Sequence, residues 1–316
     1  MGYTLRVSVL EQCQLRCSYC LPLGSRTLLR KNHWLSLSQY DKIARAMKPL
    51  SIDKVRFTGG EPLLRRDLPA IIEVFSRVFV NQTLAVTTNG QHFCDMKNDL
   101  IQAGLTAVTF HLDTLKKERY RSVMGNGDVM TVQQAIDQAL KASLNVKLNV
   151  VVQKGINDDE LIDFLTMSKI TGVKVRFIEL MNTGSATDFV KRSFLSGAAI
   201  LKKIGEFTEV VSVDRPHKSS PAEEFLAKDL ATRFGLIASD TRPFCTNCNR
   251  LRLTADGRLR TCLYEPLGHA LKCGAIDLPD DDELVRNIAL IVAQKTSFHP
   301  ALKKSVPSFS MSEIGG

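Results

Sequence analysis

Runs rich in β-branched residues alternate along the first two thirds of the chain with stretches of helical apolar spacing. The helix-like stretches are Ser36–Met47, Leu68–Phe79 and Val132–Ala142, and Asn157 to Glu160 reads as the capped start of another helix. The strand-like runs are Leu5–Leu10, Lys54–Thr58, Thr83–Thr87, Ala107–Leu112, Asn145–Val152 and Val173–Ile178. Six alternating units predict a parallel sheet with right-handed crossovers. Because six are too few for a closed eight-fold barrel, we expect an α/β fold with a partial (β/α)6 TIM-like barrel or an open sheet.

The sequence changes character near residue 212. A polar stretch from Ser212 to Glu224 predicts a loop or linker, and Asp280–Gln294 has helical spacing. Between them, Arg233–Ala238 and Leu251–Thr254 resemble short strands, with a hairpin turn predicted at Asp256-Gly257. We therefore expect a partial barrel over residues 1–211 and a small C-terminal α+β region over residues 212–316.

Basic residues interrupt four of the apolar strands. Alternation places Arg6 with Ser8, Lys54 with Arg56, Lys147 with Asn149, and Lys174 with Arg176 on one face, which in a barrel is the lumen. Buried cations are costly unless they meet an anion. Pairing with Glu61, Asp113 or Glu179, or exposure at the strand ends, is one interpretation. The other is an anionic ligand, and four converging basic strands suit a triphosphate better than a single carboxylate.

Composition narrows the class of protein. The net charge of +9 indicates an anionic partner, either nucleic acid or a phosphorylated small molecule. No apolar run is long enough to span a membrane, and the N-terminus lacks a signal pattern, so we expect a cytoplasmic protein without membrane association. In a reducing compartment, the eight cysteines favour metal ligation over disulfides.

Six of the cysteines form two groups of three. Cys13, Cys17 and Cys20 have the spacing C-x3-C-x2-C with no fourth ligand nearby, and a cluster held by three thiolates keeps one iron open to a small molecule. Cys245, Cys248 and Cys262 have the spacing C-x2-C-x13-C, which also permits a zinc ribbon with Cys273 as fourth ligand. Cys94 lies in a helical stretch and is interpreted as a small core residue.

Two loops that follow strands carry further candidate chemistry. In the run Phe57-Thr-Gly-Gly-Glu-Pro62, the glycines allow close approach of the backbone to a ligand, and Glu61 places a carboxylate that could receive an ammonium group. Thr87-Thr-Asn-Gly90 ends the third strand in the same way.

The cysteine loop, the aromatic Tyr19 before its last cysteine and the GGEP run together resemble the radical S-adenosylmethionine superfamily. The second cysteine group, with Arg250 and Arg252 beside it, resembles the auxiliary-cluster region of the GTP 3′,8-cyclase family, which catalyses the first step of molybdenum cofactor biosynthesis. Val150–Gly155, Arg176–Met181 and the terminal run Met311 to Gly316 are similar to the same family. The resemblance covers nearly the whole chain.

The resemblance implies a role for each matching residue. Cys13, Cys17 and Cys20 would hold a first [4Fe–4S] cluster, and Cys245, Cys248 and Cys262 a second. S-adenosylmethionine would meet Tyr19, Gly60, Glu61, Asn89, His111 and Met181. GTP would be bound by Arg6, Arg56, Thr87, Lys147, Arg250 and Arg252, while Arg176, Gly315 and Gly316 would act in the active site. His111 is a departure, since the family usually has serine there.

The implied reaction starts with hydrogen abstraction from the ribose C3′ of GTP and ends in 3′,8-cyclo-7,8-dihydro-GTP, so the chain would be a lyase. The implied partners are GTP, a reductant such as flavodoxin or ferredoxin, and a downstream cyclic pyranopterin monophosphate synthase. A homodimer is compatible with the sequence.

Two alternatives stay open from the residues. One is a paralogous radical enzyme with an auxiliary cluster, acting on a peptide or on another nucleotide. The other is a non-catalytic iron–sulfur or zinc protein that binds nucleic acid through its charge. The second predicts exposed cations interleaved with aromatic residues. Aromatic residues make up only 7% of the chain, and the notable cations lie in strands or beside cysteines, so we expect no nucleic-acid partner.

Overall fold

Six parallel strands form the centre of the structure, in the order in which they occur along the chain. The computed structural model describes residues 2–20, 33–182, 186–215, 217–265, 267–271 and 278–295. The central strands are β1 (Tyr3–Ser8), β2 (Ile52–Thr58), β3 (Thr83–Thr88), β4 (Ala107–His111), β5 (Asn145–Val152) and β6 (Lys174–Glu179). Each predicted strand is therefore present, with ends shifted by at most two residues.

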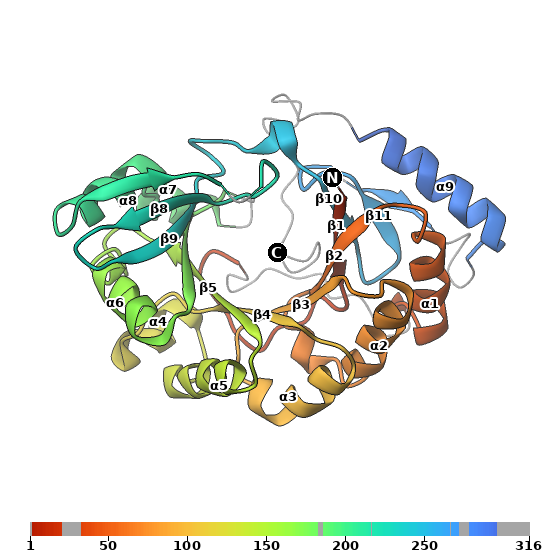
Figure 1. Ribbon diagram of the computed structural model, residues 1–316, viewed down its shortest axis with the longest axis horizontal. Coiled ribbons are helices and arrows are strands. Elements are labelled where there is room, and N and C mark those ends of the chain that lie inside the picture. The colour runs from red at the N-terminus through yellow and green to blue at the C-terminus, as the bar shows by residue number, and fades with distance from the viewer. Residues whose placement is uncertain are drawn as a thin grey trace.

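Helices cover the outer side of the curved sheet (Figure 1). They are α1 (Leu37–Ala46), α2 (Leu68–Val78), α3 (Phe93–Gln102), α4 (Lys117–Met124), α5 (Val129–Lys141) and α6 (Leu161–Thr171). Large buried side chains fill the space between helices and sheet, and rings on facing elements meet edge to face, as Phe57 does with Phe75 at 5.4 Å between ring centroids. The outward faces of the strands thus carry the apolar core, as the alternation predicted.

Three further strands extend the sheet at each end. β9 (Thr232–Ile237), β8 (Glu223–Ala227) and β7 (Val210–Val213) follow β6, and β10 (Arg250–Leu253), β11 (Arg258–Arg260) and β12 (His269–Ala270) follow β1. α7 (Thr187–Ser193) and α8 (Gly197–Gly205) lie on the β6 side, and α9 (Asp281–Ala293) lies beside α1. Within the described residues β7 and β12 do not pair, so the sheet is open. The expected partial TIM-like barrel is confirmed.

Both extensions combine parallel and antiparallel pairing. β9 joins β6 and β10 joins β1 in parallel, whereas the outer strands pair antiparallel. The turn predicted at Asp256-Gly257 connects β10 to β11, and Gly257 has the positive φ of 83° that such a turn requires. Because one sheet contains strands from both sides of residue 211, the division of the chain there stays a prediction. No helix in the described ranges is long and apolar enough to cross a membrane.

The predicted capping box at residues 157–160 is wrong. α6 begins at Leu161, and the residue before it, Glu160, makes no side-chain capping bond. Asn157 instead accepts from the backbone amide of Gln153 at 2.7 Å and donates to the backbone carbonyl of Asp113 at 2.6 Å. These backbone groups lie in a buried loop where water cannot serve them, so the asparagine is used there rather than at the helix.

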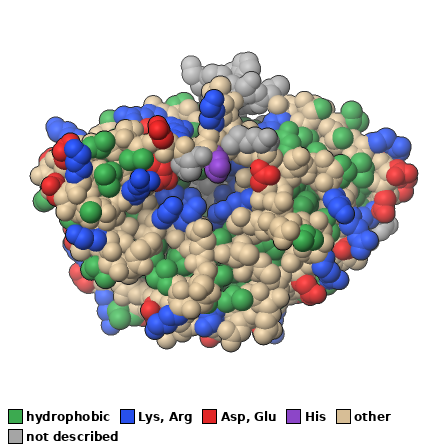
Figure 2. Space-filling view, in the orientation of Figure 1, with side chains coloured by type: hydrophobic (Ala, Val, Ile, Leu, Met, Phe, Trp, Pro, Cys, Tyr) green, Lys and Arg blue, Asp and Glu red, His purple; other side chains and the backbone are tan. Residues whose placement is uncertain are grey.

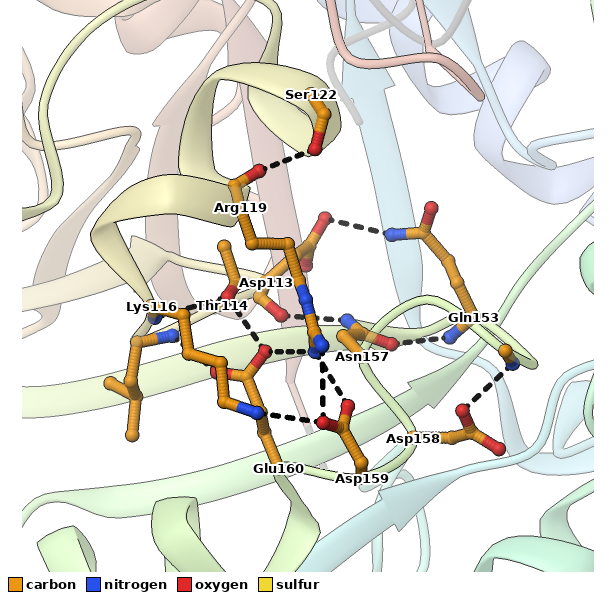
Figure 3. A network of polar contacts seen from close by, with 12 residues as sticks. Asp113, Thr114, Lys116, Arg119, Ser122, Gln153, Asn157, Asp158, Asp159 and Glu160 are labelled. Carbon is orange, nitrogen blue, oxygen red and sulfur yellow. Dashed lines mark hydrogen bonds and ion pairs between the residues drawn. The ribbon is translucent and has the colours of Figure 1, made fainter.

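A polar network joins the loops that follow β4 and β5 (Figure 3). Fully buried Glu160 accepts hydrogen bonds from the Thr114 hydroxyl at 2.7 Å, the Leu115 amide at 2.7 Å and the Arg119 guanidinium at 2.6 Å. Arg119 also donates to Asp159. One carboxylate therefore fixes the start of α6 against the segment that enters α4.

Removing this carboxylate should destabilise the protein. In Glu160→Ala, the buried Thr114 hydroxyl and the part-buried Leu115 amide lose their acceptor, and Arg119 keeps only Asp159. We expect unfolding to be easier by about 3 kcal/mol. The matched control is Asp163→Ala, an exposed acid on the same helix, with an expected effect of at most about 0.5 kcal/mol. Urea denaturation of the cluster-free proteins measures both. Equal midpoints for the two variants would show that the network adds no stability.

Candidate active site

The inward faces of the strands line one cavity of about 800 Å³. Figure 2 shows Lys and Arg side chains gathered in and around a hollow at the centre of one face. Every candidate residue that the structure describes lines this cavity: Arg6, Cys13, Cys17, Tyr19, Cys20, Arg56, Gly60, Glu61, Thr87, Asn89, His111, Lys147, Arg176, Met181, Cys245, Cys248, Arg250, Arg252 and Cys262. Gly315, Gly316 and Cys273 lie outside the described residues.

The two cysteine groups occupy opposite ends of the cavity. Cys13 follows β1, whereas Cys248 precedes β10, and these two strands run parallel side by side. A site after one strand and a site before its parallel neighbour must lie at opposite ends of the pair. The cations of the strands therefore lie between the two cysteine groups.

The first cysteine loop is held by backbone contacts with its neighbours. The Cys20 amide donates to the Cys17 carbonyl at 3.0 Å, and the Arg16 amide donates to the Met124 carbonyl at 3.0 Å. Burial, followed by neighbouring acidic groups, raises the pKa of Cys13 to about 12 and that of Cys20 to about 11. Neutral thiols are therefore favoured at neutral pH until a metal takes the place of the protons.

The GGEP run packs directly on this loop. A Cβ atom on Gly59 would lie 2.2 Å from the Leu10 carbonyl oxygen, and one on Gly60 would lie 2.2 Å from that of Gln12. Buried Glu61 accepts from the Asn89 amide at 2.7 Å and the Thr88 hydroxyl at 2.7 Å. Burial outweighs these hydrogen bonds and raises the pKa of Glu61 to about 7. Only glycine permits this contact, which places a carboxylate at the cavity wall.

Tyr19 connects the cysteine loop to the end of β4. Its hydroxyl lies 2.5 Å from His111 Nε2 and donates to Asp113 at 2.6 Å. Asp113 is fully buried and also accepts from the Val151 amide at 2.7 Å. Burial lowers the pKa of His111, but nearby Asp113 and Glu61 outweigh it and raise that pKa above its usual value. The histidine is thus part of a fixed cluster of three polar side chains.

The strand cations face one another across the cavity. Burial lowers the pKa of Arg56 to about 9, with repulsion from Arg176 as the next cause, and burial also lowers the pKa of Arg176 to about 10. Arg56 donates to Thr87 at 2.8 Å and to Thr109 at 2.9 Å, whereas the buried Nε of Arg176 has no hydrogen-bond partner. Such a cluster favours a multiply charged anion.

The three carboxylates that the sequence suggested as partners of these cations are engaged elsewhere. Glu179 accepts from the amides of Gly197, at 2.5 Å, and Asp240, at 2.9 Å, and from the Thr241 hydroxyl. Glu61 and Asp113 bind the neutral donors described above. The interpretation in which these three acids pair with the strand cations is therefore not what the structure contains.

The second cysteine group includes an arginine that is already positioned. Arg250 lies over the Phe244 ring, 4.6 Å from its centroid, and donates to Cys248 Sγ at 3.8 Å. Its other terminal nitrogen donates to the Ser219 carbonyl at 3.2 Å. Its guanidinium therefore joins the cysteine site to the loop between β7 and β8.

Several cavity residues were absent from the candidate set. Lys54, Lys174 and Asn149 line the cavity, and the alternation of the strands already placed them on its face. Asn149 Oδ1 and Thr58 Oγ1 are buried without a hydrogen-bond partner. Lys295 also lines the cavity, and no pattern in the sequence indicates this position.

Comparison with known proteins places this site in a class. Residues 7–167 match the family described as the radical SAM superfamily, and residues 173–300 match the one described as Molybdenum Cofactor Synthesis C. The first match covers the strands and loops that carry Cys13, Glu61 and His111. The fold and the site thus define a radical S-adenosylmethionine enzyme.

Curated relatives narrow the class further. GTP 3′,8-cyclase of Desulforamulus reducens is 36% identical over 317 residues, which cover 99% of this chain and 97% of the relative. That of Aquifex aeolicus is 38% identical over 276 residues, 86% of this chain and 85% of the relative. GTP 3′,8-cyclase 3 of Mycobacterium bovis is 39% identical over 273 residues, 85% of this chain and 72% of the relative. The chain belongs to the GTP 3′,8-cyclase family.

A solved structure supports the fold. Streptococcus suis SuiB bound to S-adenosylmethionine matches with a TM-score of 0.63 at 12% identity, covering 84% of this chain and 61% of SuiB. At this identity the likeness concerns the fold alone.

Family membership gives the protein two [4Fe–4S] clusters and S-adenosylmethionine as cofactors, and the residues present fit them. Each cysteine group supplies three thiols at the cavity wall. In the described residues no three His, Cys, Asp or Glu side chains are grouped to chelate a single ion. The zinc-ribbon interpretation needs Cys273, which lies outside the described residues.

Two cavity lysines should make stability depend on pH. Burial, followed by repulsion from neighbouring arginines, lowers the pKa of Lys54 from 10.5 to about 7 and that of Lys147 to about 8. In unfolded chains lysine stays protonated up to about pH 10.4. Between about pH 7 and 10 the unfolded state therefore binds more protons at these two lysines, and their contribution to the free energy of unfolding should rise with pH.

We expect Lys54→Met to reduce this rise in the cluster-free protein, measured by urea denaturation from pH 7 to 9. Lys141→Met, at an exposed lysine of α5, should leave it unchanged. The same pH dependence in Lys54→Met and wild type would contradict the assignment.

Proposed function

We propose that this protein converts GTP to 3′,8-cyclo-7,8-dihydro-GTP, the first step of molybdenum cofactor biosynthesis. The observation that carries the proposal is a single cavity with a three-cysteine site at each end and buried cations between them. The names of the curated relatives support GTP as the substrate. A volume of about 800 Å³ suits a nucleotide together with a second small molecule.

We assign residues to each cofactor according to the end of the cavity at which they lie. Cys13, Cys17 and Cys20 hold the first cluster, and Cys245, Cys248 and Cys262 hold the second. S-adenosylmethionine lies beside the first, with Glu61 available to its ammonium group. Tyr19, Gly60, Asn89, His111 and Met181 complete that end. When bound and reduced, the first cluster supplies electrons that cleave S-adenosylmethionine and so start hydrogen abstraction at the ribose C3′.

The basic residues bind and orient GTP. Arg6, Arg56 and Lys147 face the middle of the cavity, where they neutralise the triphosphate and hold the ribose at a fixed distance from the first cluster. Thr87, Arg250 and Arg252 line the cavity beside them. The bond that forms joins C3′ to C8 of the guanine, so the base has to stay close to its own ribose. We assign Arg176 to hold this folded conformation, and Gly315 and Gly316 to the same active site.

The pathway partners follow from the reaction. A one-electron donor such as flavodoxin or ferredoxin reduces the first cluster, and a cyclic pyranopterin monophosphate synthase consumes the product. A peptide or another nucleotide is the alternative substrate. A peptide gives no reason for buried cations on four neighbouring strands, so GTP is favoured.

Cyclisation tests the function directly. After anaerobic reconstitution, incubation with S-adenosylmethionine, dithionite and GTP should give 5′-deoxyadenosine and the cyclised nucleotide, identified by mass spectrometry. Lys147→Met removes one charge-assisted hydrogen bond and should weaken GTP binding about tenfold, whereas Lys141→Met should not. Formation of 5′-deoxyadenosine that does not depend on GTP, without a cyclised product, would refute the proposal.

The histidine near the first cluster should contribute to cofactor binding. His111→Ser removes one of the two partners of the Tyr19 hydroxyl and should weaken S-adenosylmethionine binding about fivefold, the effect of one net hydrogen bond of about 1 kcal/mol. Calorimetric titration of the reconstituted protein measures this, with His92→Ser outside the cavity as control. Unchanged affinity would mean that His111 only replaces the usual serine without a role in binding.

A further inference from the structure

The second cysteine group comes from two segments of one hairpin. Cys245 is the first residue of the short helix η3 (Cys245–Asn247), and Cys248 directly follows that helix and precedes β10, whereas Cys262 follows β11. β10 and β11 are antiparallel, with Arg252 opposite Arg260. If this register continued for two more residues, Arg250 would lie opposite Cys262. The pairing stops before that position, because β11 ends at Arg260. The distance between Cys248 and Cys262 therefore depends on a contact outside the ladder.

Lys295 provides that contact. Its ammonium donates to the Arg250 carbonyl at 2.9 Å and to the Thr261 carbonyl at 2.5 Å. One of these carbonyls lies two residues after Cys248, and the other lies directly before Cys262. The side chain thus bridges the two strands where their own hydrogen bonds end, and it satisfies two backbone acceptors.

The backbone that carries Lys295 is itself anchored. It follows the end of α9, whose N-cap Asp280 accepts from the Glu283 amide at 2.8 Å. Leu284 and Ile288 are buried on one side of this helix, and Asp281 lies 3.4 Å from Lys42 of α1. The ammonium is therefore held from a rigid element that is separate from the hairpin.

The charge of the bridge lies beside the thiols. Burial lowers the pKa of Lys295, while Cys248 and Cys262 act against this effect. A cation beside a cysteine favours the thiolate, which is the form that binds iron.

We propose that Lys295 is a positioning residue for the second cluster, fixing the spacing of Cys248 and Cys262 and holding a positive charge beside them. The inference rests on the proposed function, in which Cys245, Cys248 and Cys262 hold that cluster. Outer-shell partners of metal ligands are commonly worth 10- to 100-fold in metal affinity. Lys295 would therefore act on the cluster without binding it.

The test uses the full-length chain with Cys13, Cys17 and Cys20 replaced by alanine, so that only the second site can take up a cluster. In this background, Lys295→Met removes both the hydrogen bonds and the charge, whereas Lys295→Arg keeps both. The matched control is Gln294→Met, an exposed neighbour at the same end of α9. After anaerobic reconstitution, the rate of iron release to a chelator and the electron paramagnetic resonance spectrum of the reduced cluster are measured.

We expect iron to be released about tenfold faster from Lys295→Met than from Gln294→Met. The rate of iron release from Lys295→Arg should stay close to that of the background protein. The electron paramagnetic resonance spectrum of Lys295→Met should differ from that of the background protein. Equal release rates and identical spectra for Lys295→Met and Gln294→Met would overturn the inference.

Two measurements keep the test decisive. Thermal unfolding of the cluster-free proteins shows whether Lys295→Met folds. If it does not, Lys295→Gln replaces it, with faster iron release again expected and an unchanged rate again overturning the inference. Failure of the background protein itself to take up iron would refute the second cluster of the proposed function, a result separate from any effect of Lys295.

Discussion

Mutual repulsion among cations inside one cavity is the constraint on which the rest of the structure depends. Arg6, Arg56 and Arg176 lie on inward faces of the central strands, and burial together with neighbouring positive charge lowers the pKa of each. Folding therefore has to offset an unfavourable interior. The outward faces of the same strands supply the compensation, because rings such as Phe57 and Phe177 are fully buried against the helices. The barrel is stabilised from outside and is prepared for an anion inside.

Buried carboxylates serve the fold rather than the cations. Glu61, Asp113 and Glu179 lie at or just beyond the end of a strand, and Glu160 directly precedes α6. Each accepts a hydrogen bond from a backbone amide of a segment that is distant in sequence. Because these acids accept their hydrogen bonds from other groups, they do not pair with the cations of the strands. The same arrangement makes the rim of the cavity rigid where cofactors have to be held.

The two cysteine groups take their places from strand pairing. β10 is added beside β1 in parallel, so a loop after β1 and a segment before β10 are brought to opposite ends of the cavity. In the proposed function, GTP lies between the second cysteine group and S-adenosylmethionine at the first, with the basic strands along its length.

Period-two alternation and β-branched runs were enough to predict the six central strands, their polar face and the strand residues that line the cavity. Local rules work there because one face of each strand packs against helices and the other face lines the cavity, so apolar and polar residues alternate. These rules failed at Asn157, because its side chain binds the buried carbonyl of Asp113, 44 residues away in the sequence, and does not cap the helix. They could not indicate Lys295, whose acceptors lie 45 and 34 residues away. The sequence by itself determined which chemistry the chain carries, through its cysteines, its GGEP run and its strand cations. Only the tertiary structure decided which carboxylates are occupied and what holds the second cysteine group together, because hydrogen bonds between distant segments depend on packing that no local pattern contains.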